Sequence, residues 1–286
     1  MRINQNVAAL NAWRHLSGSD TELSKSLERL SSGLRINRAA DDAAGLAISE
    51  KMRSQVSGLR TAERNAMDAI SLIQTAEGAL NESHAILQRM RELAVQAATD
   101  TMTDEDRQEL QNEVTQLIGE LDRIAQDTEY NTMALFTGDF DGEGENSPLT
   151  FHIGANAGQS MEVTIDDMSA SALGGVNDGN GDVFIDDVEI DTRADANFAI
   201  DVIDAAIGQI SEQRSSLGAV QNRLEHTIAS LGMAVENLQA AESRIRDADM
   251  ALEMTIFTRN QILLQSGTAM LAHANMKPQS VLQLLG

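Results

Sequence analysis

The 286-residue chain contains no cysteine and only two prolines, and aromatic residues make up 3% of it. Without cysteine, neither a disulfide framework nor a thiolate metal site can form. So few rings and prolines are unusual for an ordinary globular core or a loop-rich fold, and they favour long helices. The N-terminal sequence lacks the apolar stretch of a signal peptide, and no later stretch is long and apolar enough to span a bilayer. We therefore expect a cytosolic protein, or one secreted by a route that needs no cleaved leader.

Acidic residues outnumber basic ones, and the net charge of −23 is unevenly distributed. Residues 130–196 hold fourteen carboxylates and one basic residue, Arg193, whereas residues 240–286 are neutral. A dense acidic segment is typical of a solvated outer surface. Because phosphate binding needs clustered Lys and Arg, nucleic acid is not an expected partner. The nearly neutral ends of the chain suit protein–protein contact.

Two long blocks have the seven-residue spacing of coiled-coil helices. The first block repeats at Met52, Leu59, Ala66, Ile73, Leu80, Leu87 and Ala94. The second block predicts a coiled-coil seam at Ile203, Ile210, Leu217, Leu224, Leu231, Leu238, Ile245 and Leu252. The second apolar position of the heptad, held by Ile228 and Val235, becomes acidic at Glu242 and Asp249. We therefore expect this seam to weaken or change partner near residue 240.

Three further helices follow from apolar spacing and capping residues. A helix over 104–128 has a plausible N-cap in Thr103, followed three residues later by Asp106. An N-terminal amphipathic helix ends near Gly33, and a C-terminal helix ends before Pro278. We expect the stripes of these two terminal helices to be assembly residues: Val7, Leu10, Leu23, Leu27, Leu30, Phe257, Leu264 and Leu271.

Residues 137–196 have a different character. Alternating FHI, MEVTI and VFIDDVEI segments, separated by glycine-rich runs, predict short strands and turns. The expected fold is mainly α: a long antiparallel helical hairpin or coiled-coil bundle. Both termini pair at one end, and a small β and loop insertion lies at the other. The predicted domains are 1–42 with 240–286 (terminal helices), 43–136 with 195–239 (coiled-coil domain) and 137–194 (acidic insertion).

The terminal segments have one apolar stripe each and few expected partners within the chain. Because most helix stability comes from packing, such a pair is only marginally stable alone. We predict that these ends are poorly ordered in the free monomer and fold on association. If subunits repeat one head-to-tail contact without closing a ring, a helical filament results.

Two regions of the sequence are informative beyond their spacing. Near the N-terminus they are MRINQNVAALNAWRHL, ERLSSGLRINRAADDAAGLAISEKMRSQ and ISLIQTAEGALNESHAILQRMRELAVQAA, and at the C-terminus the continuous stretch from SSLGAVQNRLEH to MKPQSVLQLLG. In these segments the sequence resembles the bacterial flagellins. These segments cover about 200 residues at both ends, in the family's order. Three positions depart from the usual pattern: Trp13 is unusual, Ala69 stands where many relatives have Gly, and His273 replaces a more usual Gln.

The resemblance implies a structural subunit that assembles with itself into an extracellular flagellar filament, and not an enzyme. It implies paired terminal helices in an inner tube, a second layer of middle helices and a solvent-facing insertion. It also implies unfolded export through the flagellar type III channel, with an export chaperone on the C-terminal helix. Hook–filament junction and cap proteins are further implied partners. No cofactor, metal or membrane partner is implied.

One further property is carried over from the family. Leu87 to Leu93 matches the stretch by which an animal Toll-like receptor senses some flagellins, and Arg89, Leu93 and Glu113 correspond to the recognition residues. Arg89 and Leu93 share one helix face because they are four residues apart. The simpler interpretation is that this face contacts a neighbouring subunit, and receptor binding is then a secondary property of the monomer.

Other candidate sites are weak. Asp178, Asn180 and Asp182 with Glu189 half-match a calcium loop, but the required glycine is replaced by Val183, so a solvated turn is the better interpretation. The five histidines have no metal-ligand spacing, and no GxSxG, P-loop or HExxH motif is present. A hook–filament junction protein shares terminal helices and stays the alternative to the filament subunit. An enzymatic filament subunit and an adhesin or receptor ligand are the alternatives from other classes.

Overall fold

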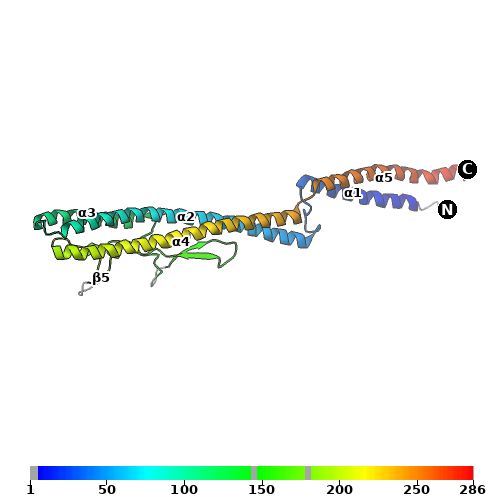
Figure 1. The fold of residues 1–286 in the computed structure, drawn as a ribbon. Coiled ribbons are helices and arrows are strands. Elements are labelled where there is room, and N and C mark those ends of the chain that lie inside the picture. Colours follow the sequence, from blue (N-terminus) through cyan, green and yellow to red (C-terminus); the bar gives the residue numbers. More distant parts are fainter. Residues whose placement is uncertain (1–5, 143–146, 178–181, 286) are drawn as a thin grey trace. The chain divides into compact units, whose positions relative to one another are not determined.

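The structure is a computed structural model that describes residues 6–142, 147–177 and 182–285, with side chains described as far as residue 277. Helices dominate it (Figure 1), as expected for a mainly α fold. The long helices are α1 (Val7–Ser32), α2 (Ala43–Ala97), α3 (Asp104–Asp127), α4 (Arg193–Arg246) and α5 (Met250–Leu285). Between α3 and α4, the described residues form short strands and a 3-10 turn.

The chain divides into two compact units. The first contains residues Met1–Val56 and Glu236–Gly286, and the second contains Ser57–Val235. Helices α2 and α4 contribute residues to both. The three-part division expected from the sequence concerns layers of an assembly, so it stays a prediction.

In the first unit, α1 and α5 pack against each other in antiparallel order (Figure 1). The Asn6 amide caps the first turn of α1 by accepting from Ala9 N, and its Nδ2 donates to the carbonyl oxygen of Ala274 at 2.8 Å. At the other end of α1, Arg29 lies 3.8 Å from Glu253. Gly33 ends α1 with φ at +73°, a left-handed conformation that glycine adopts without a Cβ penalty. The predicted end of this helix near Gly33 is therefore confirmed.

In the second unit, α2 runs antiparallel to both α3 and α4. Arg91 pairs with Asp204 at 2.6 Å and Arg193 with Asp100 at 2.9 Å, which orients α2 against α4. The core between the helices is almost entirely aliphatic. Its fully buried heptad members include Ala66, Ile73, Leu80, Leu87, Ala94, Ile203, Ile210 and Leu224. The seven-residue spacing thus identified the packed faces of both helices.

The turn between α2 and α3 is fastened at both sides. The N-cap predicted at Thr103 is present, and it forms a capping box with Asp106 in which each side chain bonds the other residue's backbone N–H. Arg107, which is buried, donates to the carbonyl oxygens of Ala97 at 2.9 Å and Thr99 at 3.0 Å. Those carbonyls have no partner within α2, since they lie at or just beyond its end. Arg107 therefore acts as a C-terminal cap for α2.

Among the described residues after α3, three small antiparallel strand pairs are present. They pair β1 (Glu129–Tyr130) with β2 (Met133–Ala134), β3 (Leu149–His152) with β4 (Ser160–Val163), and β5 (Val176–Asn177) with β6 (Asp182–Val183). The strands expected from FHI and MEVTI are β3 and β4. The VFIDDVEI segment differs from expectation, because only its start is in β6 and residues Ile185–Asp187 form a 3-10 turn, η1. The rest of the weak calcium motif, at 178–181, lies outside the described residues.

The insertion lies along the helices of its unit rather than only at the end of the hairpin, which corrects the expected position. Side-chain amides of the helices bind its backbone. Asn65 donates to the carbonyl oxygen of His152, Gln213 to that of Thr164, and Gln209 accepts from Gly174 N. Its apolar side chains enter the helical core, including Met161, Val163, Ile165, Met168, Leu173, Ile185 and Ile190. Burial of this apolar face explains why a segment with so many carboxylates lies against the helices.

One helix end was predicted wrongly. Helix α5 continues through Pro278 to Leu285 instead of ending before the proline. A proline removes one hydrogen bond of the helical ladder, but the ladder can continue on either side of it.

Candidate assembly surface

Helix α1 presents two different faces. The residues that are not exposed include a set that recurs every three or four positions: Asn6, Ala9, Ala12, Leu16, Ser19, Leu23, Ser26 and Leu30. The larger side chains Val7, Leu10, Trp13 and Leu27 are 51–59% exposed. The predicted stripe therefore mixed two faces, since Leu23 and Leu30 turn inward and Val7, Leu10 and Leu27 turn outward. The inner face is mostly small or polar, and the outer face has the larger apolar groups.

Helix α5 also has an inner and an outer side, and its inner side combines polar and large apolar residues. Its predicted residues Phe257, Leu264 and Leu271 are half-buried. Gly267 allows close approach of the two helices, because a Cβ there would lie 3.0 Å from Leu16 Cδ1. The exposed large apolar residues of α5 are Met250, Leu252, Met254, Ile262, Leu263, Met270 and Met276. We call these seven, together with Val7, Leu10, Trp13 and Leu27, the outer apolar face.

Between α1 and α5 lie several polar groups that are almost completely removed from solvent. Ser26, Glu253 and Asn260 are 2–7% exposed. Arg29 is the cation near Glu253, and the 3.8 Å separation makes this an ion pair without a direct hydrogen bond. Buried polar groups lower the stability of a helix pair unless they are fully bonded. The interior of the α1–α5 pair is therefore a weak core.

A short backbone bridge joins the linker between α1 and α2 to the linker between α4 and α5. Arg35 N donates to the carbonyl oxygen of Arg246 at 2.7 Å, and Ala248 N donates to that of Gly33 at 2.9 Å. The Arg35 guanidinium also donates to the carbonyl oxygen of Ile245. These bonds hold the C-terminal end of α1 beside the C-terminal end of α4, so the two linkers lie next to each other.

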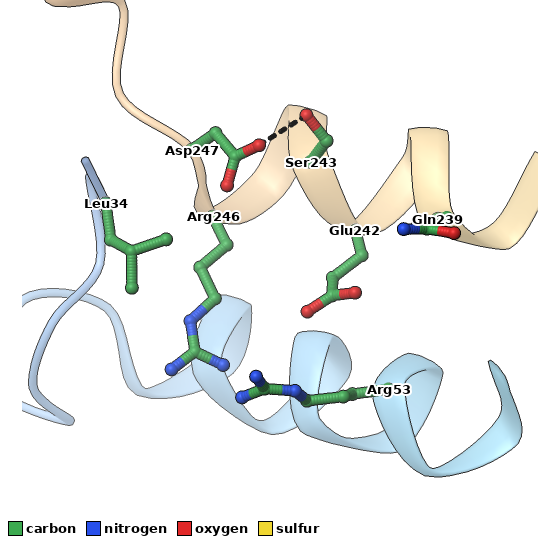
Figure 2. Close-up of a pocket in the computed structure, with 7 residues that line it drawn as sticks. All are labelled: Leu34, Arg53, Gln239, Glu242, Ser243, Arg246 and Asp247. Atoms are coloured by element: carbon green, nitrogen blue, oxygen red, sulfur yellow. Dashed lines mark hydrogen bonds between the residues drawn. The ribbon is translucent and has the colours of Figure 1, made fainter. Parts of the chain in front are cut away.

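Beside this bridge is a hollow of about 420 Å³ (Figure 2). Arg246 reaches across it from α4 towards α2, where it pairs with Glu50 at 2.5 Å. Arg53, Glu242 and Asp247 also line the hollow, so two cationic and two anionic side chains face it. Its charges balance internally, which favours a structural role for these residues at the junction of the linkers.

The predicted seam of α4 ends in this region. Ile203, Ile210, Leu217, Leu224 and Leu231 are buried, and Leu238 and Ile245 are half-buried. Leu252 is 59% exposed and belongs to α5, so its assignment to the seam was wrong. The helix breaks at Asp247 to Asp249, and the Asp249 carboxylate caps α5 by accepting from Ala251 N and Leu252 N. The expected weakening near residue 240 reflects this break.

Sequence comparison decides the family of the chain. The model of the bacterial flagellin N-terminal helical region matches residues 3–141, and that of the bacterial flagellin C-terminal helical region matches residues 200–285. The chain belongs to the bacterial flagellin family. It is 52% identical to the flagellin of Bacillus subtilis and 52% identical to the flagellar filament 33 kDa core protein of Treponema phagedenis, with full coverage of both chains in each comparison.

A comparison of folds gives a more distant likeness. A Vibrio parahaemolyticus chain described as flagellar hook-associated matches with a TM-score of 0.59 and 14% identity, covering 72% of this chain and all of the other. At this identity the match shows a shared fold only. Flagellins are structural subunits of the extracellular flagellar filament and not enzymes, and this chain is one of them.

The flagellin residues carried over for receptor recognition are only partly brought together on the surface. Arg89 is exposed and donates to Glu113 Oε1 through Nε at 3.0 Å and Nη2 at 2.9 Å. It also bonds Glu92, and these carboxylates raise the pKa of the Arg89 guanidinium above its ordinary value, with the Glu113 hydrogen bond as the largest cause. Leu93 is 1% exposed and packs in the core, so it does not belong to this surface.

Within the described ranges, no group of three His, Asp or Glu side chains is placed to hold a metal ion. No described helix is long and apolar enough to cross a membrane. The sequence had identified the two terminal helices but missed exposed Ile262, Leu263 and Met270. A helical wheel of residues 250–276 could have identified them, because it shows apolar residues on both sides of the helix.

Proposed function

We propose that the chain polymerises through the outer apolar face of α1 and α5, where copies of the same chain cover it. The observation that carries this proposal is the mixed burial within the pair. Small and polar residues such as Ser26, Asn260 and Gly267 share the inner side with half-buried apolar residues, while large apolar residues such as Leu10 and Ile262 are left 55% and 60% exposed. A stable isolated pair would instead keep its polar residues outside and its large apolar residues inside.

The physical reason for assembly follows from this arrangement. Many large apolar side chains exposed on one helix pair mark an interaction site, because leaving them in water is unfavourable. The α1–α5 pair has a weak core of its own, so contact with further subunits supplies the missing packing. Head-to-tail repetition of one such contact gives an open helical filament. Family membership supports the same conclusion for the whole chain.

The remaining expected partners are further proposals. An export chaperone that covers α5 before secretion would shield the exposed Met250 to Met276 surface, which is a hazard for aggregation. Export by the type III channel, and contact with hook–filament junction and cap proteins, are proposals that only the family resemblance supports. A Toll-like receptor that senses the monomer would bind the exposed Arg89–Glu113 pair, and Leu93 would act only through packing.

The competing functions predict different assemblies. A junction protein would form short, capped or monomeric particles, whereas a filament subunit forms long polymers. The distant structural likeness to a hook-associated chain shows the fold alone and does not favour the junction role. A receptor ligand or adhesin is compatible with polymerisation.

The deciding experiment is polymerisation of the purified full chain, followed by electron microscopy and sedimentation. The test variant is Leu10→Ser with Ile262→Ser, two residues that are 55% and 60% exposed. Because full burial of such a side chain contributes about 1.5–3 kcal/mol, each substitution removes about 1–2 kcal/mol of assembly free energy. Together they raise the critical concentration by roughly one hundredfold, at about 1.4 kcal/mol per tenfold.

The matched control is Met67→Ser, an exposed apolar residue of the second unit that is 47% exposed. We expect long filaments from the wild type and the control, and soluble subunits from the double variant at the same concentration. Urea unfolding of all three should agree, since none of the changes touches the helical core. Filament growth by the double variant at the wild-type concentration contradicts the proposed surface.

A further inference from the structure

Methionine is concentrated on the outer apolar face. The chain has thirteen methionines. Among the described residues, those whose side chains are exposed are Met67, Met133, Met233, Met250, Met254, Met270 and Met276. The last four lie on α5 and are 46–61% exposed. The most accessible thioethers of the first unit therefore lie on the surface proposed for assembly.

Other methionines provide a contrast within the same chain. Met90, Met161 and Met168 are buried in the core of the second unit, with 0–7% exposure. Met67, Met133 and Met233 are exposed but belong to the second unit and are not members of the outer apolar face. The chain thus has buried thioethers, exposed thioethers outside the assembly surface and exposed thioethers on it.

We propose that Met250, Met254, Met270 and Met276 are oxidation sites through which two-electron oxidants of the peroxide class block assembly of the free subunit. The inference rests on the proposed function. A thioether sulfur attacks one oxygen of hydrogen peroxide, the O–O bond breaks and an S–O bond forms. A proton passes to the departing hydroxide, which leaves as water. The sulfur loses two electrons and the peroxide gains them, so methionine becomes methionine sulfoxide.

The change acts on packing. A thioether is apolar and adaptable, whereas a sulfoxide carries a strong hydrogen-bond acceptor that is solvated in the free subunit. Covering that acceptor with an apolar neighbour leaves it unpaired, and each such loss weakens the contact by about tenfold or more. Met250 and Met254 are one helical turn apart, so their effects fall on one patch of surface. Once subunits have assembled, the same thioethers are covered and protected.

The first experiment needs no variant. The wild-type chain is partly oxidised with hydrogen peroxide, quenched and allowed to polymerise. Peptide mass spectrometry then measures sulfoxide at each methionine in the pelleted filaments and in the supernatant. We expect sulfoxide at Met250, Met254, Met270 and Met276 to be depleted from filaments by about tenfold relative to the supernatant. Sulfoxide at Met67, Met133 and Met233 should be equal in both fractions.

The second experiment uses a resistant variant in which all four α5 methionines become leucine, a change that conserves size and apolar character. Its matched control replaces Met67, Met133 and Met233 with leucine. After full peroxide treatment, the α5 variant should polymerise like untreated protein, whereas wild type and control stay soluble. Treatment of oxidised wild type with methionine sulfoxide reductases of both stereospecificities should restore polymerisation.

The outcomes separate the two ideas. If untreated wild type fails to polymerise, the proposed function is wrong and this inference is overturned with it. If untreated protein polymerises and oxidised wild type does so equally well, only the oxidation site is overturned. Equal sulfoxide at the four α5 positions in pellet and supernatant overturns it as well, even where the leucine variant proves unable to assemble.

Discussion

Gln111 makes the most specific connection between the helices and the insertion, so its removal tests how the second unit holds together. Its Nε2 donates to the carbonyl oxygen of Val188 at 3.2 Å, and its Oε1 accepts from Ile190 N at 2.8 Å. One side chain therefore satisfies two backbone groups of a segment in which the side chains of Val188 and Ile190 are buried. The variant Gln111→Leu keeps a similar volume and removes both bonds.

The expected cost follows from the two groups left behind. A buried backbone group without a partner costs about 1–3 kcal/mol, which gives about 2–6 kcal/mol for both. Gln111 is itself half-buried, so water can reach part of this site and the lower portion of the range applies. We expect a loss of about 2–3 kcal/mol in the free energy of unfolding. With a urea m-value of roughly 2–3 kcal/mol/M, the midpoint should fall by about 1 M.

The assay is urea unfolding of the full chain, with hydrogen exchange at the Ile190 amide as a local readout. The matched control is Gln108→Leu, an exposed position on the same helix. Loss of exchange protection at Ile190 together with the midpoint shift supports the account. If Gln111→Leu unfolds within about 0.5 kcal/mol of the control, the two hydrogen bonds do not fasten the insertion and the reasoning is wrong.

Two further predictions concern charged groups. Arg89→Ala and Glu113→Ala should each weaken Toll-like receptor signalling by the monomer by about tenfold, as for a charged hot-spot residue. A double variant that signals like wild type refutes the assignment of receptor recognition to these residues. Leu93→Ala serves as a stability control because Leu93 is buried. Hydrogen bonds from the Thr103 side chain and, second, from its backbone N–H lower the pKa of Asp106. The ionised Asp106 carboxylate therefore stabilises the fold fully above the ordinary Asp pKa, and this stabilisation is lost as the pH falls through the lowered pKa. Asp106→Asn should therefore destabilise the chain in urea at about pH 6, with the difference from wild type shrinking towards about pH 2; a constant difference refutes this.

The packed faces of α2 and α4 could be predicted because residues seven positions apart lie on the same face of a helix. Leu80 and Leu224 are fully buried where that spacing placed them. The helix limits at Thr103 and Gly33 were predictable because capping is a local interaction of a few residues. Leu252 was assigned to the seam wrongly because the seven-residue spacing was extended across the break between α4 and α5, which spacing alone does not reveal.

The terminal helices were predicted, but their two faces were not separated. Val7 and Leu23 both fit an amphipathic stripe, and only the position of α5 shows that Leu23 is covered while Val7 is exposed. The sequence also suggested no contact between the insertion and the helices. Its alternating segments predicted strands without indicating that Asn65, Gln111 and Gln213 would bind its backbone.

By itself, then, the sequence determined the helical class, the heptad faces, the capped ends and the flagellin family, because each rests on interactions between residues close along the chain or on a long match to relatives. Only the tertiary structure decided which apolar residues of α1 and α5 stay exposed, that Leu93 is buried and that the insertion lies against the helices. Those features depend on which surfaces meet across long separations in sequence, and the burial of an apolar group depends on what covers it.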